Sequence, residues 1–488
     1  RTVFSDIILG VLKQLVETRQ DLRVIITSAT INHESFSEYF NHIPVLRIEG
    51  KMFPVKDIYM PIDSIDSLID QIKSIVIKIH CNDQENGHIL VFLTGEEDIE
   101  NCCEALSTIP KLVVMPLYAS IDYESQNKVF EPVRTNERKV IIATNIAETS
   151  ITIDGIKFVI DSGFVKQSYF NYEENVDILQ TVKISQSQAN QRKGRAGRTN
   201  SGCCYRLYSE DDYKSFESEI EPEIYRKDLC QVFLKLTSME LDPFKFQYMD
   251  SPHVNVLLKC AEELRDLGCI NENNKITEIG KIVNHFPVEP AIGKVLYTSS
   301  KYGCSINVIN MFAMVLEKNL FLTDKASKKR IYKLKSKFSD LYGDYSMYSN
   351  IFNHWMNNGK SMDWCDDNCI KVESIDEMSL IRDQLIGIMQ WMNLSVEEQI
   401  PESCQNSVQK SILSGFYKNV CRHENSDKYF NIKRKKLIYL HPSSCLIKSK
   451  PDLIIYHSSF QIKKPFIHVA MTIDIKVLKE FLEEKDSI

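Results

Sequence analysis

A glutamine and two arginines stand at helical spacing in residues 191–198 (QRKGRAGR). In a helix, Gln191, Arg195 and Arg198 occupy positions i, i+4 and i+7, so all three project from one face. Arginine forks suit phosphate oxygens, whereas a glycine inside a helix costs roughly 1 kcal/mol relative to alanine. The two glycines of the segment therefore predict close backbone approach beside a phosphate-binding stripe. The alternative, a solvated arginine-rich surface helix, is disfavoured by these glycines.

Two further polar segments begin where apolar runs end. Residues 143–155 (ATNIAETSITIDG) start at the end of the run Lys139–Ala143, and residues 92–97 (FLTGEE) start at the end of Ile89–Leu93. Ligands of open parallel sheets bind at the edge formed by the carboxyl ends of the strands. Both segments are therefore expected at one ligand-binding edge.

The first half of the chain alternates apolar runs with amphipathic stretches. The strand candidates are Val24–Thr27, Ile89–Leu93, Leu112–Met115, Lys139–Ala143 and Phe158–Asp161. They are apolar without alternation, as in strands buried on both faces of a parallel sheet. Helical patterns such as Ser5–Glu17 and Glu96–Ser107 lie between them. This order predicts nucleotide-binding α/β layers.

The pattern changes after Tyr208. Residues 209–400 read as almost entirely helical, with long amphipathic stretches at Val254–Leu267 and Ile306–Lys318. From Lys410 onward, β-branched and aromatic runs return. These runs are Leu437–Leu440, Leu453–His457 and Phe466–Ala470. Short strands separated by turn residues predict a small β-barrel.

These segments resemble the motifs of the DEAH-box (DEAH/RHA) RNA helicases. Residues 191–198 resemble motif VI, usually QRAGRAGR, with Lys193 in place of an alanine. Residues 143–155 resemble motif V over their whole length, residues 92–97 resemble motif IV, and residues 28–30 (SAT) resemble motif III. The four matches occur in the order of the family, and the resemblance extends from Arg1 to about Phe481.

The resemblance implies an α/β RecA-like motor domain, the tail of a first one, winged-helix and helical ratchet domains, and a C-terminal OB-like β-barrel. The expected boundaries are 1–51 for the remnant of the first RecA-like domain, 52–208 for the second with a β-hairpin insertion at 167–185, 209–274 for the winged-helix domain, 275–400 for the ratchet-like domain, and 401–488 for the OB-like domain and tail.

The resemblance also implies site roles. Catalysis is assigned to Gln191, Arg195 and Arg198, the arginines acting as fingers and the glutamine positioning the attacking water. Nucleotide binding is assigned to Phe130, Thr152, Asp154 and Gly194, and coupling to Ser28, Ala29 and Thr30. RNA binding is assigned to Thr94, Gly95, Thr144, Asn145, Asn350 and Arg382. No metal ligand is assigned within the chain.

Two of these features, Phe130 and the hairpin, also have a purely structural interpretation. A lone Phe130 before a loop is more often a core residue, but the surrounding family match favours stacking on the nucleotide base. A stacked ring contacts the face of the base and not the edge that carries its hydrogen-bonding groups, so weak selectivity among nucleoside triphosphates is expected. The hairpin of residues 167–185 is either a plain surface hairpin or the family element that helps part duplexes. Its acidic tip, with Glu173, Glu174 and Asp177, would act sterically because it repels phosphate.

The C-terminal half carries weaker matches. Residues 222–226 (PEIYR) resemble the start of the winged-helix domain, and residues 343–345 (GDY) resemble a ratchet motif that usually reads GDH. Residues 414–417 (SGFY) and 441–444 (HPSS) match the barrel. The basic run 433–436 is foremost a solvated strand edge, with phosphate contact and nuclear import as alternatives.

Composition limits the choice of function. The chain has 488 residues, 43% hydrophobic and 26% charged, and a formal net charge of −7, so an RNA site must be a local channel. No apolar run approaches the ~20 residues that span a bilayer, so no membrane role is expected. The 14 cysteines include no CxxC pair and read as reduced, semi-buried side chains of an intracellular protein.

Arg1-Thr2 matches the residues that follow the family's Asp-Glu-Ala-His box, and no GxxxxGK[ST] loop occurs in the chain. The cofactors implied are ATP, or another nucleoside triphosphate, and Mg²⁺, whose ligands are expected upstream. Since phosphoryl transfer depends on positioning and charge neutralisation, the 488 residues alone are expected to be inactive, and the full-length protein active.

The expected function is ATP-dependent translocation on single-stranded RNA and remodelling of duplexes or ribonucleoproteins. The alternatives are a non-catalytic RNA clamp or assembly scaffold, and a DNA helicase. The partners implied are RNA, ribonucleoprotein complexes and an activator of the G-patch type. The expected location is the nucleus or nucleolus, with the cytoplasm as an alternative. Ribosome biogenesis is faintly favoured as the pathway, with splicing as its rival.

Overall fold

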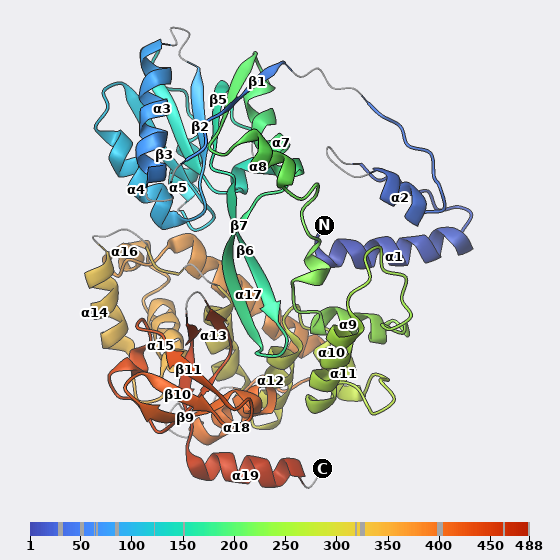
Figure 1. The fold of residues 1–488 in the computed structure, drawn as a ribbon. Helices are drawn as coiled ribbons and strands as arrows, with labels where there is room; N and C mark the ends of the chain where they lie inside the picture. Colours follow the sequence, from blue (N-terminus) through green and yellow to red (C-terminus); the bar gives the residue numbers. More distant parts are fainter. Residues whose placement is uncertain are drawn as a thin grey trace. The chain divides into compact units, whose positions relative to one another are not determined.

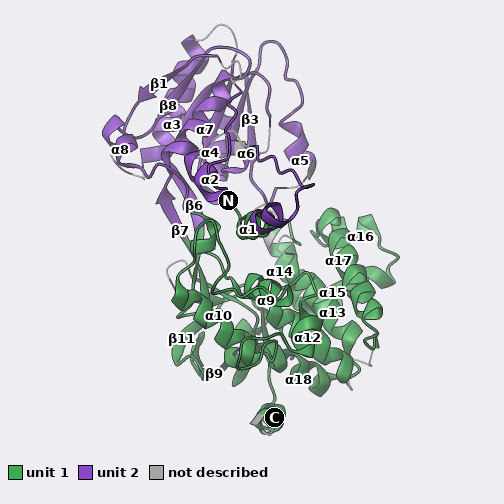
Figure 2. Cartoon of the chain, turned by 90° about the vertical axis from the view of Figure 1, so that its right-hand side faces the viewer, with its two compact units in different colours: residues 1–11, 168–179, 222–488 green, residues 12–167, 180–221 purple. Residues whose placement is uncertain are grey.

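The structure is a computed structural model. It describes residues 1–27, 33–48, 53–62, 64, 67–82, 87–121, 123–149, 152–317, 320–322, 327–397, 404–461 and 464–486. The chain divides into two compact units, coloured separately in Figure 2. Unit 1 contains residues 1–11, 168–179 and 222–488, and unit 2 contains residues 12–167 and 180–221.

Unit 2 is built on a six-stranded sheet in which every paired strand is parallel. Its strands, in spatial order, are β1 (Val55–Tyr59), β8 (Gly202–Arg206), β5 (Ile156–Asp161), β2 (His88–Phe92), β4 (Arg138–Ala143) and β3 (Leu112–Leu117). The central strands β2, β4 and β5 are almost fully buried, which confirms the reading of their apolar runs. Strands β1 and β8 escaped prediction because each is short and interrupted by polar or small residues.

Helices cover both faces of this sheet (Figure 1). Helices α3 (Leu68–Asn82) and α4 (Glu96–Ser107) bury their apolar stripes with strand residues in one cluster. The other face is covered by segments that include α5 (Tyr123–Lys128), α6 (Ile146–Thr149) and the turn after α7 (Gln186–Gly194). The predicted α/β layers are confirmed.

The first residues of the chain hold two helices, α1 (Val3–Thr18) and α2 (His33–Tyr39). The strand predicted at Val24–Thr27 was wrong, because these residues form no regular element. A strand of a parallel sheet needs hydrogen-bonding neighbours, and the described residues 1–48 provide none. Ile25 is accordingly 86% exposed. The SAT tripeptide at 28–30 lies outside the described residues.

From residue 222 to about residue 416, unit 1 is mainly helical (Figure 1). Its longer helices are α9 (Cys230–Ser238), α10 (Val254–Asp266), α12 (Pro290–Lys301), α13 (Ser305–Leu316), α14 (Lys328–Phe338), α15 (Asp344–Asn357), α17 (Val372–Trp391) and α18 (Gln405–Phe416); the shorter α11 (Glu278–Val283) and α16 (Met362–Asp367) lie between them. Helices α10 and α13 confirm the two predicted amphipathic stretches. An antiparallel bridge joins Ile270 and Ile276, which lie on opposite sides of the domain boundary predicted at residue 274. The predicted domain limits stay predictions.

The C-terminal strands form the barrel-like sheet predicted for this region. They are β9 (Val420–Asn425), β10 (Lys428–Asn431), β11 (Lys436–Leu440), β12 (Leu453–Tyr456), β13 (Ser459–Gln461), β14 (Pro465–Ile467) and β15 (Ala470–Thr472), followed by α19 (Ile475–Asp486). The strand predicted at Phe466–Ala470 is split, because β14 pairs with β11 and β13 whereas β15 pairs with β12. The chain changes partner strands at the break.

The segment SGFY at 414–417, which the sequence assigns to the OB-like domain, does not itself form a strand. It forms the end of α18 and the following 3₁₀ turn. A Cβ on Gly415 would lie 2.3 Å from the carbonyl oxygen of Ala291, at the start of α12. The glycine therefore permits close packing of α18 on α12, and the aromatic runs of the barrel begin later, at Val420.

All 14 cysteines are free and most are buried. Asp228, Cys230 and Cys260 place three potential ligand atoms within 4.8 Å of one another, a proximity that sequence spacing did not predict. The hydrogen bond with Cys260 and burial hold the pKa of Cys230 well above its usual value, so its thiol is protonated at neutral pH. Among the described residues, no helix has the length and hydropathy to span a membrane.

Candidate nucleotide and nucleic-acid sites

Motifs IV and V lie at one edge of the unit 2 sheet. Strands β2 and β4 are parallel neighbours, with Phe92 in register with Ala143. The residues that follow them are Thr94, Gly95, Thr144 and Asn145. The structure thus brings these four predicted RNA contacts to the same carboxyl-end edge. The exposed Lys166 side chain packs over Gly95, a cation at this edge that the sequence did not reveal.

Motif V is tied to motif VI through Glu148, a residue of α6. Its carboxylate accepts hydrogen bonds from Arg192 Nε at 2.7 Å and from Gln188 Nε2 at 3.3 Å. Its backbone carbonyl accepts a hydrogen bond from Arg195. One residue of motif V therefore holds both the helix that carries motif VI and one of the predicted arginine fingers.

Arg192, which has no assigned role, is fully buried between two carboxylates. Besides Glu148, it donates from Nη1 to Asp161 Oδ1 at 2.7 Å. The carboxylates raise the pKa of Arg192 against the opposing effect of burial. Asp161 also accepts from the Tyr208 hydroxyl at 2.8 Å, and Arg206 donates to that hydroxyl at 2.6 Å. A charge buried in this way is held by paired hydrogen bonds.

The helix predicted through residues 191–198 ends earlier than expected. A capping box of Ser185 and Gln188 starts α7, which stops at Gly194, and residues 195–197 form a 3₁₀ turn. A Cβ on Gly197 would lie 2.7 Å from the Phe53 carbonyl oxygen. This glycine therefore permits packing against the chain leading into β1, rather than approach to a ligand.

The two predicted fingers differ in exposure as a result. Arg195 is 9% exposed, and burial together with the charge of Arg198 lowers the pKa of Arg195 to about 10, so it remains protonated at neutral pH. Arg198 is exposed and donates from Nη1 to Thr152 Oγ1 at 2.5 Å. This contact joins a predicted finger to a predicted ribose ligand, while Gln191 is half-buried on α7.

Phe130 is 49% exposed, so the core alternative for this ring was wrong. The Lys139 ammonium donates to the carbonyl oxygens of Val129 and Glu131 at 2.7 Å each, and thereby fixes the backbone on both sides of the ring. Burial lowers the pKa of Lys139, and the nearby Glu131 and Asp154 oppose this effect. Asp154 therefore lies near Lys139, the residue that holds the loop of Phe130. Sequence patterns had identified Lys139 only as a residue of a predicted strand.

Lys193, the departure from the family pattern, has a structural partner. Its ammonium lies 2.5 Å from Asp57 Oδ2 on β1, and Arg206 Nε lies 2.8 Å from Asp57 Oδ1. Lys193 and Arg206 together lower the pKa of Asp57 against the opposing effect of burial. Consecutive residues Arg192 and Lys193 thus anchor the end of α7 to separate sites of unit 2.

Comparison with known proteins agrees with this geometry. Residues 67–200 match the helicase conserved C-terminal domain, and residues 408–484 match an oligonucleotide/oligosaccharide-binding (OB)-fold. The chain is 36% identical, over 98% of its length, to the pre-mRNA-splicing factor ATP-dependent RNA helicase prp22 of Schizosaccharomyces pombe. The chain belongs to the DEAH-box helicase family. It spans 42% of that relative's length, and the residues matched to the helicase C-terminal domain, 67–200, lie mostly in unit 2.

In this chain, the GDY and HPSS segments meet inside unit 1. The buried Asp344 carboxylate accepts from Ser444 Oγ at 2.7 Å, from the Cys445 amide at 2.8 Å and from the Ala470 amide at 3.0 Å. Gly343, with φ 105°, leaves room for the Ala470 carbonyl, 2.5 Å from an ideal Cβ. Both matched segments therefore join the helical region to the barrel.

The two predicted RNA contacts of this region are already hydrogen-bonded. Asn350 donates to the Phe338 carbonyl at 3.1 Å and to Asp340 Oδ2 at 3.2 Å. Arg382 donates from Nε to Asn310 Oδ1 at 2.8 Å and pairs with the neighbouring Asp383. Arg382 is 21% exposed, so RNA contact would use its remaining donors.

The helicase hairpin is formed by β6 (Phe164–Asn171) and β7 (Val176–Lys183), which confirms a hairpin at this place. Its outer part, residues 168–179, belongs to unit 1, where Asp177 pairs in parallel with Phe460 of β13. Lys436 donates to the Glu174 carbonyl. The tip is thus fastened to the barrel. Of the run 433–436, only Lys433 and Lys435 are exposed, which disfavours the whole run as a solvated edge.

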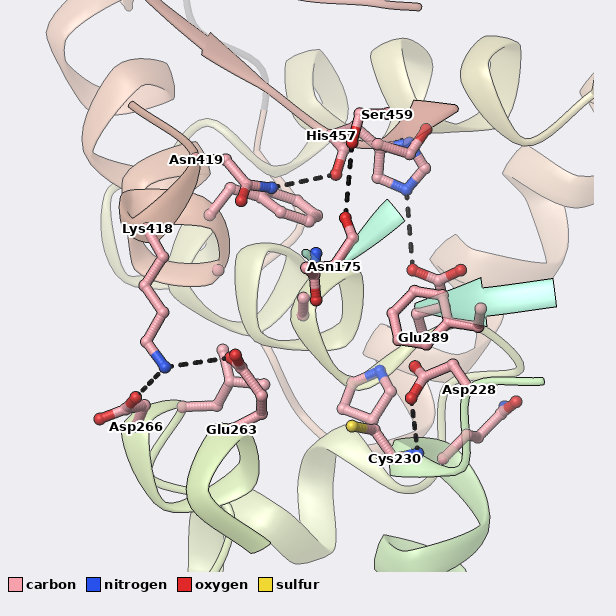
Figure 3. A pocket seen from close by; sticks show the side chains of 18 of the residues that line it. Asn175, Asp228, Cys230, Glu263, Asp266, Glu289, Lys418, Asn419, His457 and Ser459 are labelled. Carbon is pink, nitrogen blue, oxygen red and sulfur yellow. Dashed lines mark hydrogen bonds and ion pairs between the residues drawn. The ribbon is translucent and has the colours of Figure 1, made fainter. Parts of the chain in front are cut away.

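A cavity of about 360 Å³ lies beside the tip and is drawn in Figure 3. Its carboxylates belong to Asp177, Asp228, Glu263, Asp266 and Glu289. Lys418 pairs with both Glu263 and Asp266, and Ser459 Oγ donates to the Asn175 carbonyl at 3.4 Å (Figure 3). The five carboxylates outnumber the cations Lys227, Lys418 and Arg434 in this lining, which therefore disfavours phosphate.

We expect Tyr172→Phe to release this tip. The Tyr172 hydroxyl donates to the Lys227 carbonyl at 2.7 Å and accepts from the Leu229 amide at 2.8 Å. Its loss leaves a buried amide unpaired, at a cost of about 1–3 kcal/mol. Hydrogen exchange of residues 168–179 should accelerate. Tyr225→Phe, at a ring that is 43% exposed, is the matched control and should leave exchange unchanged. Equal exchange in both variants would show that the hydroxyl does not hold the tip.

Proposed function

We propose that the full-length protein is an ATP-dependent RNA helicase that uses nucleotide hydrolysis to move along single-stranded RNA and to remodel duplexes or ribonucleoproteins. The observation that carries this proposal is the physical connection of motifs V and VI in unit 2. Glu148 binds Arg192 and Arg195, and Thr152 binds Arg198. Motif V, which carries the proposed RNA contacts Thr144 and Asn145, is thereby linked to the arginines that are proposed to contact phosphate.

The proposed mechanism assigns distinct tasks to these residues. Thr94, Gly95, Thr144 and Asn145 bind the RNA backbone at the sheet edge. Phe130 stacks on the nucleotide base, and Thr152 and Asp154 bind its ribose. Arg195 and Arg198 stabilise the charge that develops on the γ-phosphate, and Gln191 orients the attacking water. The phosphate loop and Mg²⁺, which neutralises phosphate charge, are assigned to the first motor domain.

The substrate class follows from the relative's printed name. That protein is a pre-mRNA-splicing factor, so we propose a nuclear role on splicing ribonucleoproteins and prefer it to ribosome biogenesis. An activator of the G-patch type remains a family expectation within this proposal.

The test is RNA-stimulated hydrolysis by the full-length protein. Because Phe130 offers a ring face and no base-specific hydrogen bond, we expect ATP, GTP, CTP and UTP to be hydrolysed with kcat/KM values within about tenfold of one another. Strand displacement should be faster on RNA than on DNA duplexes. A strong preference for one base would contradict the stacking assignment. No RNA-stimulated hydrolysis of any nucleotide would favour the non-catalytic clamp, and faster DNA unwinding would favour a DNA helicase.

A further inference from the structure

Helix α14 has an unusual charge for this chain. Its sequence, KKRIYKLKSKF, contains six basic and no acidic residues, whereas the whole chain has a formal net charge of −7. Between α14 and the HPSS-containing loop lies a cavity of about 610 Å³, which we call the α14 groove. Its polar lining includes Tyr332, Lys335, Ser336, Ser339, Ser443 and Lys448. A basic groove in an acidic protein marks a local site for an anion.

Lys335 is a cation of the groove that forms no ion pair with the described residues. Its ammonium is half-buried, and its hydrogen-bond acceptor is the Ser443 carbonyl at 3.5 Å. No carboxylate of the described residues lies within ion-pair distance of it. Asp340 also lines the groove, but its oxygens accept hydrogen bonds from the Tyr342 amide, Ser346 and Asn350. The buried Asp344 carboxylate acts on Lys335 only beyond ion-pair distance, and its oxygens accept hydrogen bonds from Ser444 and two amides. A half-buried ammonium without a direct ion pair favours an anionic ligand.

The groove also offers an aromatic face. The Tyr332 ring is 53% exposed, and the Lys448 ammonium lies 5.1 Å from its centroid. An exposed ring beside basic groups is the arrangement that proteins use to stack bases of single strands while their phosphates are neutralised. The serine hydroxyls add donors and acceptors of the kind that phosphate and ribose use. An acidic protein segment would use the cations but not the ring.

We propose that the α14 groove binds single-stranded RNA, with phosphates at Lys335 and Lys448 and a base on Tyr332. The proposal rests on the proposed function and extends it by a second RNA-binding segment in unit 1. The groove is continuous with the predicted RNA contact at Asn350, since Asn350 donates to the Asp340 carboxylate that lines it. It involves none of the residues assigned to the motor site.

The experiment measures the affinity of the full-length protein for an oligouridylate of about 12 nucleotides, over a range of salt concentrations. Lys448→Glu should weaken binding about tenfold and reduce the slope of log K against log salt by about 0.7, the value for one phosphate contact with a single strand. Tyr332→Ala should weaken binding about fivefold without changing that slope. Lys335→Glu should have the same effect as Lys448→Glu. Because Lys335 is half-buried, the Lys335→Glu variant could misfold, and in that case the result for the exposed Lys448 decides the test.

Lys333→Glu is the matched control. Lys333 is exposed on the same helix but does not line the groove, so its charge reversal should leave affinity and slope nearly unchanged. Equal effects of Lys333→Glu and Lys448→Glu would overturn the proposal in favour of a diffuse field. Normal RNA affinity in the groove variants would also overturn it, and binding of an acidic peptide that only they lose would assign the groove to protein. If the unmodified protein binds no RNA, the proposed function itself fails.

Discussion

Replacing Arg198 with alanine in the full-length protein should reduce kcat for RNA-stimulated ATP hydrolysis by about 10³- to 10⁵-fold, the contribution of an arginine finger. The side chain is exposed, and its described partner is the hydroxyl of the exposed Thr152. Its removal therefore leaves no buried group unpaired. The Kd for RNA and the unfolding temperature should stay nearly unchanged, because the predicted RNA contacts of unit 2 lie elsewhere, after β2 and β4.

Arg134→Ala is the control for this loss of charge. Arg134 is in the same unit, its side chain is 85% exposed, and its distance from Glu137 is 4.0 Å, the limit of an ion pair. It should leave ATP hydrolysis unchanged. Arg198→Lys keeps the charge without the planar fork, and should restore only a small part of the rate. A parallel loss of RNA affinity and hydrolysis in Arg198→Ala would show a structural role instead.

The sequence predicted the centre of the sheet and the edge at which motifs IV and V lie together. Strands β2, β4 and β5 are buried on both faces, so their apolar runs are unmistakable. Local patterns also predicted α4 at its observed limits. The predicted strand at Val24–Thr27 failed because an apolar run specifies a strand only where neighbouring strands pair with it. Tertiary partners therefore decided what local pattern could not.

The least predictable part of the site is its support. Arg192 lies in the matched segment, yet its partners Glu148 and Asp161 are 44 and 31 residues away in sequence. Nothing in the spacing of residues 191–198 distinguishes this buried arginine from the two assigned as fingers. The same holds for Asp344, which accepts hydrogen bonds from amides 101 and 126 residues later in the sequence. Such contacts require the fold before they can be identified.

Replacing Arg192 with methionine should destabilise unit 2 by about 3–5 kcal/mol, a large part of the stability of an ordinary domain. Methionine keeps much of the volume but leaves the carboxylates of Glu148 and Asp161, 6% and 0% exposed, without their shared cation. All three tryptophans lie at positions 355, 364 and 391, in unit 1. Far-UV circular dichroism should therefore show an earlier transition, while the tryptophan fluorescence transition stays in place.

A double-mutant cycle separates lost pairing from lost packing. Glu148→Gln alone should cost less than Arg192→Met, because Arg192 keeps Asp161 and the amide still accepts a hydrogen bond. In the Arg192→Met background, Glu148→Gln removes one buried charge that has lost its partner. The double variant should therefore lose about 1–3 kcal/mol less unfolding free energy than the sum of the two single losses. Simple additivity would mean that Arg192 acts through its volume alone. The ion pairs would then not be what holds motif VI to motif V, and Arg195 would owe its position to packing.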